Sequence, residues 1–462
     1  NNCTSHLELL RGRVKFPTGG TARDPLEAIP RPIRFESGAD SHSLDERRYN
    51  RDMLQCLLFV LPCFTHMRKQ ALFVLCALFD AFQAGLFVLE LIKMSEITQR
   101  DLHYMRHALE LAKRGAGHVS PNPMVGAVLV KDDRIIGEGW HEHIGGLHAE
   151  RNAFKNCTED CTGATIYVTL EPCCHWGRTP PCTDAILEHK IARVVVGCLD
   201  PNPLVAGKGL RILRDAGISC VSGVLENECH AVNEVFFHYI TTKTPFVVMK
   251  YAMTLDGRIA AYTGDSKWVT GETARLHVQE TRKRLSGIMV GIGTVLADDP
   301  MLNCRIETGV DPIRLICDSQ LRTPLDSQLV RTARDIPTWI FCAHAQPERV
   351  TALEEAGVRV VSLPDADGKR VDLRAVMNYL GEQQVDSVLL EGGGTLNGEA
   401  LRLGLVHKVQ AYIAPKLIGG ASAHGPVGGP GIAKMADALH LADLTITRLG
   451  EDILIEGRIR KD

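Results

Sequence analysis

The sequence predicts an α/β protein with two consecutive domains, preceded by a long N-terminal extension. From Met94 onward, apolar runs of strand length alternate with segments of helical periodicity, which is typical of sheets with helices packed on their faces. A chain of 462 residues is long enough for two or three domains of ordinary size. We therefore predict a leader at 1–93, a first domain at 94–241 and a second domain at 242–462.

The charge balance and the cysteines narrow the function classes. A formal net charge of -3 leaves no excess of positive charge to neutralise a nucleic-acid backbone, so small molecules are the expected substrates. The 15 cysteines are scattered along the chain without the dense spacing of a small disulfide-rich secreted domain. They indicate reduced thiols in a cytoplasmic protein, and some of them can hold a metal.

Residues 1–93 differ from the rest of the sequence. They begin without Met, pass through a stretch rich in Pro, Gly and Arg, and continue into "LQCLLFVLPCF" and "ALFVLCALFDAFQAGLFVLELI". The second run has about the length of a membrane span, but Asp80, Gln83 and Glu90 would be costly in hydrocarbon. A membrane anchor stays open as the alternative. The sequence favours a leader that is spurious or disordered, with the working protein beginning at Met94.

Each element of the first domain has its own sequence signal. In "DLHYMRHALELAKRG", Leu102, Met105 and Leu109 recur at helical spacing, and Gly115 supplies a stop. The stretch "MVGAVLVKDDRIIGEGWHEH" predicts a β-hairpin that turns at Asp132 and Asp133. The elements expected after it are a helix at 148–157, a strand "ATIYVTL", a helix at 181–189, a strand "ARVVVGCLD" and a helix ending near Ala216.

A second series of strands begins after "TTKTPF" and predicts a separate α/β domain. Its strand-like runs alternate with helical stretches, and the whole has an ordinary domain size. The predicted strands are "FVVMKYAM", "GIMVGIG", "IRLICD", "PTWIFCA", "VRVVSL", "SVLLEGG" and "KVQAYIAPKLIG".

The stretches "HAERNAFKN" and "EPCCHWGRTPPC" predict a metal site in the first domain. His148 opens a helix, and Cys173 and Cys182 bracket a Gly/Pro-rich loop that can bring two thiolates to the same ion. Three protein ligands and one open position describe a catalytic zinc site, in which zinc lowers the pKa of water to about 7. Glu150 can carry a proton from that water to a leaving amine. The predicted chemistry is hydrolytic deamination.

These motifs, with "VTLEPCCHWGRTPPC", "PNPMVGAV" and "DPNPLVAGKGL", resemble the deaminase half of the bifunctional riboflavin-biosynthesis deaminase/reductase family. Zinc deaminases carry H-x-E followed by P-C-x-x-C. Here eight residues separate the two cysteines, which is the spacing of that family. The resemblance implies a cytidine-deaminase-like domain with zinc on His148, Cys173 and Cys182, and Glu150 as proton shuttle. It also implies substrate contacts from Asn122, His141, His175, Arg178 and Asn202.

Several of these residues have structural alternatives. Cys174 stands where the family commonly has serine, so it is a rival ligand, an adjacent thiol that packs, or part of a redox-active vicinal pair; we favour packing. Arg178 is the best phosphate candidate because a guanidinium pairs bidentately with phosphate oxygens. For Asn122 and Asn202 the alternative is turn chemistry beside proline, and for His141 it is packing.

The second domain contains "SVLLEGGGTLNGEAL", in which backbone N-H groups at a helix start can cradle a phosphate. The run is weak evidence alone, because it is not the G-x-G-x-x-G of a dinucleotide fingerprint. With "KYAMTLDGRIA", "GDSKWVTG", "GIGTVLADDPMLNCR" and "CDSQLRTP", it resembles the reductase half of the same family, which is dihydrofolate-reductase-like and uses NADPH. The resemblance implies NADPH contacts from Ala252, Trp268, Thr294, Asp298, Ser319, Gly393, Gly394, Thr395, Leu396, Asn397 and Gly398.

For the substrate of this half, the resemblance implies contacts from Lys250, Ser266, Arg282, Leu302, Arg305 and Glu391, with Asp256 close by. Arg282 and Arg305 make chemical sense as a phosphate clamp. The expected function is riboflavin biosynthesis by a zinc-dependent deamination followed by an NADPH-dependent reduction. The resemblance also implies a homo-oligomer that binds a phosphorylated pyrimidine. From the charge balance we expect no nucleic-acid partner, and from the polar residues in the leader we expect no membrane. The alternatives are a nucleoside or tRNA deaminase fused to an unrelated reductase, and a non-catalytic zinc and nucleotide sensor.

Overall fold

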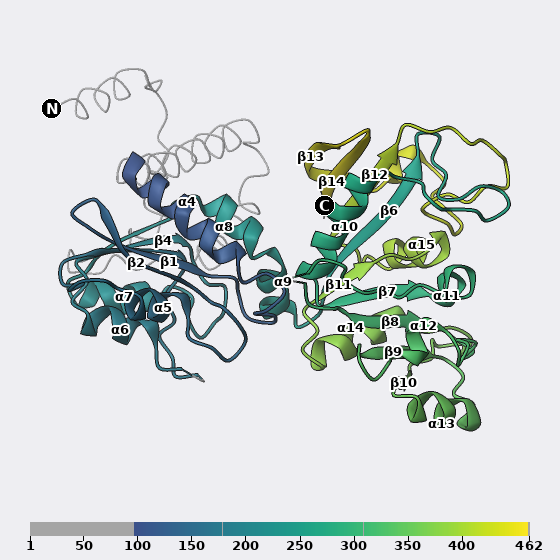
Figure 1. The fold of residues 1–462 in the computed structure, drawn as a ribbon, viewed down its shortest axis with the longest axis horizontal. Coiled ribbons are helices and arrows are strands. Elements are labelled where there is room, and N and C mark those ends of the chain that lie inside the picture. Colours follow the sequence, from purple (N-terminus) through teal and green to yellow (C-terminus); the bar gives the residue numbers. More distant parts are fainter. Residues whose placement is uncertain (1–96, 178, 308, 461–462) are drawn as a thin grey trace, which may run out of the picture. The chain divides into compact units, whose positions relative to one another are not determined.

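A computed structural model describes residues 97–177, 179–307 and 309–460 (Figure 1). The predicted leader at 1–93 and the phosphate candidate Arg178 lie outside the described residues. Among the helices that are described, none combines the length and the apolar character that crossing a membrane requires.

The first sheet has five strands in the order β2-β1-β3-β4-β5. The predicted hairpin is present, and its turn residues Asp132 and Asp133 have φ values of 48° and 62°, the left-handed region that a tight hairpin turn needs. β3 runs antiparallel to β1 and parallel to β4, which is parallel to β5. The strands are β1 (Gly126–Lys131), β2 (Arg134–Trp140), β3 (Thr165–Leu170), β4 (Arg193–Cys198) and β5 (Ser219–Ser222).

Helices cover both faces of this sheet (Figure 1). Alternate residues of each strand point to opposite faces, so Ile166 and Val168 pack with one set of helices while Tyr167 packs with the other. The first set is α5 (Ala149–Lys155), α6 (Cys182–Glu188) and α7 (Lys208–Asp215), and the second is α4 (Gln99–Lys113) and α8 (Glu226–Val232). α4 starts with a capping box in which the side chains of Thr98 and Asp101 each accept a backbone N-H.

The second sheet has nine strands in the order β10-β9-β8-β7-β11-β6-β12-β14-β13. The seven strands from β10 to β12 are mutually parallel, whereas β14 and β13 continue the sheet in antiparallel fashion. The strands are β6 (Phe246–Thr254), β7 (Gly287–Gly291), β8 (Ile313–Cys317), β9 (Thr338–Cys342), β10 (Arg359–Ser362), β11 (Ser387–Leu390), β12 (Lys408–Ala414), β13 (Leu441–Leu449) and β14 (Asp452–Ile459).

The helices of this part divide between the two faces of the sheet. Leu380 of α14 and Ala400 of α15 share a buried cluster with Met289, whereas Val295 of α11 and Leu353 of α13 share another. The helices are α9 (Glu234–Thr242), α10 (Glu272–Arg284), α11 (Ile292–Asp298), α12 (Gln328–Arg331), α13 (Pro347–Glu355), α14 (Leu373–Glu382) and α15 (Gly394–Arg402), with a short 3-10 turn, η3 (Met435–Asp437).

The C-terminal strands differ from the sequence-based prediction. The strand expected over "KVQAYIAPKLIG" ends at Ala414, because Pro415 follows and cannot donate a backbone hydrogen bond to the sheet. The hairpin of β13 and β14 was not predicted. β13 is an edge strand with Leu444 and Ile446 exposed, so it lacks the alternation of buried and exposed residues that marks a strand in a sequence.

Candidate active sites

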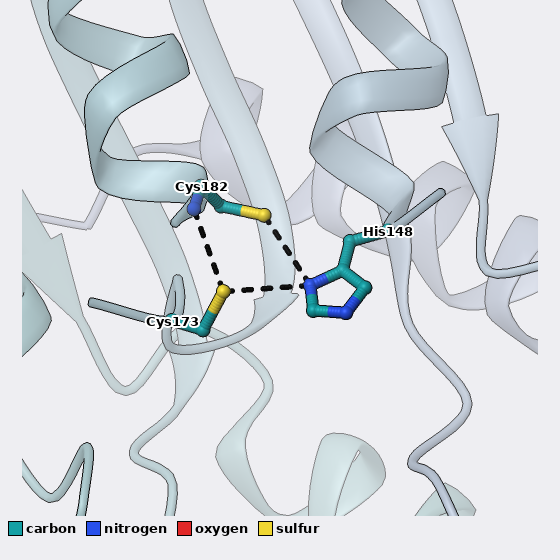
Figure 2. A group of neighbouring side chains, drawn as sticks. All are labelled: His148, Cys173 and Cys182. Carbon is teal, nitrogen blue, oxygen red and sulfur yellow. Dashed lines mark hydrogen bonds between the residues drawn. The ribbon is translucent and has the colours of Figure 1, made fainter. Parts of the chain in front are cut away.

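Three segments of the first domain bring His148, Cys173 and Cys182 together (Figure 2). His148 is the N-cap of α5, Cys182 is the first residue of α6, and Cys173 lies in the loop that follows β3. The Sγ atoms of Cys173 and Cys182 lie 3.4 Å and 3.5 Å from the Nδ1 atom of His148. Tetrahedral zinc with these ligands separates them by roughly 3.5 Å. The donor set and its spacing therefore fit Zn²⁺.

The protonation of this group also suits a cation. Hydrogen bonding from Cys182, together with the neighbouring His148 ring, lowers the pKa of the Cys173 thiol to about 4. The same contact with Cys173, together with burial, raises the pKa of the Cys182 thiol well above its ordinary value. One sulfur is thus a thiolate at neutral pH, while the other exchanges its proton for a metal ion when one binds.

Glu150 lies two residues after His148, in the first turn of α5, and is 3 % exposed. Burial, followed by the nearby thiolate of Cys173, raises the pKa of its carboxyl group above the ordinary value. A carboxyl group with a raised pKa holds a proton more readily than a free one, so it can return a proton that it has accepted. The residue is therefore suited to general acid/base catalysis beside the metal ligands.

Four further residues named from the sequence line a cavity of about 380 Å³ together with His148, Glu150 and Cys173: Asn122, His141, His175 and Asn202. Burial lowers the pKa of His141, so its ring is neutral at neutral pH. Its Nδ1 atom lies 3.0 Å from the carbonyl oxygen of Leu147 and its Nε2 atom lies 3.3 Å from the amide nitrogen of Asn122. The Nδ1 atom of His175 is buried and has no hydrogen-bond partner among the described residues.

Cys174 lies outside the ligand group. Its thiol donates to the carbonyl oxygen of Leu204 at 3.7 Å, and the residue is half-buried. Burial raises the pKa of this thiol. The geometry therefore supports the reading of Cys174 as a thiol that packs beside the site.

Arg151, which was not predicted from the sequence, supports the loop between Cys173 and Cys182. The side chain extends from α5, and its Nε and Nη2 atoms donate to the carbonyl oxygens of Pro180 and Pro181 at 3.1 Å and 2.7 Å. Pro181 directly precedes Cys182, so Arg151 fixes the backbone on which the second thiol is carried. The sequence contains no signal for this role, because it depends on contacts with residues 29 and 30 positions away.

Two carboxylates near the cavity were also missed. Asp200 lines the cavity, and burial raises the pKa of its carboxyl group to about 6. Glu171 accepts the N-H groups of Gly207 and Leu210 at 2.8 Å and 3.2 Å, at the start of α7. Each follows the carboxyl end of a strand, β3 or β4, where α/β proteins place their sites; this position was the available signal.

The predicted reductase residues gather along one edge of the second sheet. Glu391 and Gly393 follow β11, Thr294 follows β7, and Ser319 follows β8. These strands are parallel, so their carboxyl ends lie at the same edge, where ligands bind in α/β sheets. The other predicted residues lie in β6 (Lys250, Ala252), in the segment after it (Asp256, Ser266, Trp268), in α11 (Asp298) and after α11 (Leu302, Arg305).

Glu391 is the centre of a buried charge network. The Nε and Nη2 atoms of Arg282 donate to its two oxygens at 2.8 Å and 3.0 Å, and the Nζ atom of Lys250 lies 3.6 Å away. Burial alone would raise the pKa of Glu391, but Arg282 and Lys250 hold it at about 2. The Nη1 atom of Arg282 donates to the carbonyl oxygen of Asn303. The guanidinium of Arg282 is thus engaged on all three nitrogens, whereas the side chain of Arg305 is exposed.

The glycine-rich loop contains two kinds of glycine. A Cβ atom at Gly394 or Gly398 would collide with backbone atoms of Gly425 or Gly428, so both glycines are required by packing. Asn397 is fully buried and its Nδ2 atom donates to the carbonyl oxygen of Pro426. By contrast, a Cβ atom at Gly393 would meet no atom within 4 Å. The open part of the loop is therefore the N-cap at Gly393, followed by the exposed Thr395.

Asp256 and Trp268 are tied to the segment after β12. The carboxylate of Asp256 accepts the N-H of Gly419 at 2.7 Å, and the carbonyl oxygen of Trp268 accepts from the Nζ atom of Lys416 at 2.8 Å. The Trp268 ring is 58 % exposed and is covered on one side by the guanidinium of Arg275, 4.7 Å from the ring centroid. The ring thus offers an open aromatic face beside this segment.

Comparison with known proteins identifies both halves of the chain. The model of the cytidine and deoxycytidylate deaminase zinc-binding region matches residues 98–198, and that of the RibD C-terminal domain matches residues 245–455. The riboflavin biosynthesis protein RibD of Actinobacillus pleuropneumoniae is 54% identical over 359 residues, which cover 78% of this chain and 95% of that protein. The chain belongs to the RibD family. The RibD of Escherichia coli K12 is 39% identical, over 77% of this chain and 98% of that protein.

Solved structures of RibD proteins support the same family assignment. A RibD structure from Acinetobacter baumannii superposes with a TM-score of 0.70 and 39% identity, covering 79% of this chain and 99% of that chain. A structure from Thermotoga maritima, described as a diaminohydroxyphosphoribosylaminopyrimidine deaminase/5-amino-6-(5-phosphoribosylamino)uracil reductase, gives 0.69 and 37%, covering 78% and 99%. The chain is a bifunctional enzyme of riboflavin biosynthesis, with a zinc-dependent deaminase and an NADPH-dependent reductase. The predicted family, fold class, function and cofactors are confirmed, and both alternative functions are set aside.

Proposed function

We propose that the first domain deaminates 2,5-diamino-6-(5-phosphoribosylamino)pyrimidin-4(3H)-one and that the second reduces the ribosyl group of the product to a ribityl chain with NADPH. The observation that carries this proposal is the buried carboxyl group of Glu150 beside His148, Cys173 and Cys182. Glu150, His148 and Cys173 line a cavity of about 380 Å³, which is within the usual range for a small-molecule site. The similarity to the deaminase/reductase of Thermotoga maritima supports the same pair of reactions.

In the deaminase, each residue has a distinct task. His148, Cys173 and Cys182 would hold zinc, which when bound supplies Lewis-acid activation of the hydrolytic water. Glu150 accepts a proton from that water and delivers one to the departing amine. His141, neutral and held by the carbonyl oxygen of Leu147, fixes the amide of Asn122 toward the cavity.

The remaining polar groups of the cavity bind the substrate. The buried Nδ1 atom of His175 has no partner among the described residues, which supports a hydrogen bond to a ligand at this position. Asn202 lines the same cavity and offers both an acceptor and a donor for the pyrimidine edge. Arg178 stays our candidate for the phosphate.

In the reductase, Arg282 and Arg305 have different roles, although both were predicted from the sequence to bind the substrate phosphate. Arg282 positions Glu391, because its donors are already engaged, and Arg305 is the residue that receives the substrate phosphate. Glu391 and Lys250 face the ribosyl group. The N-H groups at the start of α15 receive a phosphate of NADPH, supported by the open space at Gly393. The remaining nucleotide and substrate residues keep the roles that the family resemblance implies.

The deciding experiment is an assay of the purified chain on the diaminopyrimidine phosphate, with and without NADPH. We expect ammonia release in both cases and NADPH oxidation only after deamination. The matched variant Glu150→Gln keeps the shape of the side chain, so zinc content and reduction of supplied deaminated substrate should survive. Deamination should fall by at least about 10²-fold. Near-normal ammonia release from a folded, zinc-loaded Glu150→Gln protein would contradict the mechanism.

We also propose that the protein works as a homo-oligomer in the cytoplasm. The edge strand β13 exposes Leu444 and Ile446, at 58 % and 72 %, and an exposed apolar strand edge is a surface that a second copy can cover. Sedimentation of the intact chain and of Ile446→Lys tests the assembly, since the variant should dissociate.

The free cysteines among the described residues support a reducing compartment. A chain that begins at Met94 should hold zinc and catalyse both steps.

A further inference from the structure

The segment between α5 and β3, "NCTEDCTG", carries two cysteines that the active site does not use. The Sγ atoms of Cys157 and Cys161 lie 2.7 Å apart, and both residues are free cysteines. A disulfide bond has an S-S length of about 2.05 Å, so the two sulfur atoms need to move by less than one ångström to bond. We propose that Cys157 and Cys161 form a reversible intramolecular disulfide when the protein meets a disulfide oxidant such as oxidised glutathione.

The backbone already holds the two residues in a geometry that brings their sulfur atoms together. Just after the end of α5, the N-H of Cys157 donates to the carbonyl oxygen of Phe154 at 3.1 Å. Just before β3, the carbonyl oxygen of Cys161 accepts from the N-H of Ala164 at 3.0 Å. Between them, the N-H of Thr158 donates to Ile136 of β2 at 2.8 Å. The ends of this five-residue segment are therefore fixed, and bonding requires no rearrangement of the sheet or the helix.

The difference in exposure between the two thiols sets the order of the reaction. Cys157 is partly exposed, whereas Cys161 is 4 % exposed. The thiolate of Cys157 attacks one sulfur of oxidised glutathione, forming a mixed disulfide and releasing one glutathione thiolate. The thiolate of Cys161 then attacks the Sγ atom of Cys157 and releases the second. Two protein thiols are oxidised to one disulfide, one glutathione disulfide is reduced, and the two thiol protons pass to the two glutathione molecules.

The structure also supplies an internal comparison. Cys198 and Cys229 are neighbours too, since hydrogen bonding with Cys229 raises the pKa of Cys198, but both are fully buried. An oxidant in solution cannot reach either sulfur atom in the folded protein. The ligands Cys173 and Cys182 would be engaged by zinc. Among the described residues, Cys157 and Cys161 are thus the pair of neighbouring thiols in which one sulfur atom is partly exposed to an oxidant and neither is a predicted zinc ligand.

The test uses the zinc-loaded full chain in glutathione buffers of increasing oxidised fraction, followed by alkylation of free thiols. Cleavage with a protease that cuts before aspartate breaks the bond between Glu159 and Asp160, so Cys157 and Cys161 fall on different fragments unless a disulfide joins them. We expect joined fragments from most molecules in oxidised glutathione, separate fragments after reduction, and unchanged zinc content. Cys161→Ser should stop at a glutathione adduct on Cys157, and Cys229→Ser should join like the parent. Full alkylation of both cysteines at every ratio, or a persistent adduct on Cys157 of the parent protein, would overturn the proposal.

Discussion

Replacing Arg282 by Met should destabilise the second domain by about 3 kcal/mol at neutral pH. The wild-type carboxylate of Glu391 has its pKa lowered from 4.5 to about 2 by Arg282 and Lys250, against the effect of burial. A shift of one pKa unit corresponds to about 1.4 kcal/mol, so the network favours the charged form of Glu391 by about 3 kcal/mol. Removing one partner of a buried ion pair leaves an uncompensated charge, and such changes cost about 3–5 kcal/mol. Lys250, at 3.6 Å, offsets part of that cost.

The pH dependence gives the sign of the effect. Because the folded-state pKa of Glu391 is lowered, its stabilising contribution is fully present above pH 4.5 and is lost as the pH falls through about 2. In Arg282→Met the buried negative charge of Glu391 is balanced only by Lys250, so protonation of this carboxylate at acidic pH removes the cost of burying the charge. The difference in stability between wild type and variant should therefore shrink from neutral pH toward acidic pH.

Urea unfolding from pH 7 down to pH 3, followed by the fluorescence of the chain's tryptophans, measures this difference. Arg284→Met is the matched control, because Arg284 lies on the same helix and is exposed; it should change stability by less than about 0.5 kcal/mol. The double variant Arg282→Met/Glu391→Gln should regain part of the lost stability. A loss in Arg282→Met that stays constant with pH, or no loss at all, would refute the view that Arg282 acts through the charge of Glu391.

Three further predictions concern metal and phosphate. Cys173→Ser and Cys182→Ser should lose zinc and deamination together, whereas Cys174→Ser should keep both; an empty site in Cys174→Ser, measured by metal analysis, would mean that the ligand set is wrong. Arg151→Met should release zinc to a chelator about tenfold faster, as is typical when an outer-shell contact is lost, while Lys155→Met on the same helix should behave as wild type. Arg305→Ala should raise the KM for the phosphorylated substrate far more than that for NADPH, and the reverse result would show that the two pockets have been exchanged.

The fold was largely predictable because its signals are local. Strands such as "ATIYVTL" and "SVLLEGG" are apolar runs of strand length, and Asp132 and Asp133 mark a hairpin through their turn chemistry. The β13–β14 hairpin was missed because an edge strand with exposed apolar side chains has no buried face to reveal its period. The end of β12 at Ala414 could have been predicted, since proline follows it.

The grouping of His148, Cys173 and Cys182 was predictable because its chemistry is restrictive: few arrangements need one histidine, two cysteines and a carboxylate in two short motifs. The role of Arg282 was not predictable from a single residue type, because it depends on Glu391, 109 positions away. For the same reason, the requirement for glycine at Gly394 could not be separated from ligand binding until its contact with Gly425 was seen. Long-range partners, which sequence spacing does not reveal, decide whether a charged or small residue binds or packs.

The anchoring of Pro180 and Pro181 by Arg151 divides the segment between the two cysteine ligands into parts with different freedom. The part next to Cys182 is held against α5, and Cys173 lies three residues after the end of β3, so the two cysteines are positioned from both ends of the segment. Residues 174–177 and Thr179 lie between these anchors, and His175 among them lines the cavity. Substitutions there would change the lining of the cavity without replacing a predicted ligand or its anchor. We therefore expect residues 174–177 and Thr179 to be suitable positions for engineering the substrate preference while the predicted metal ligands stay unchanged.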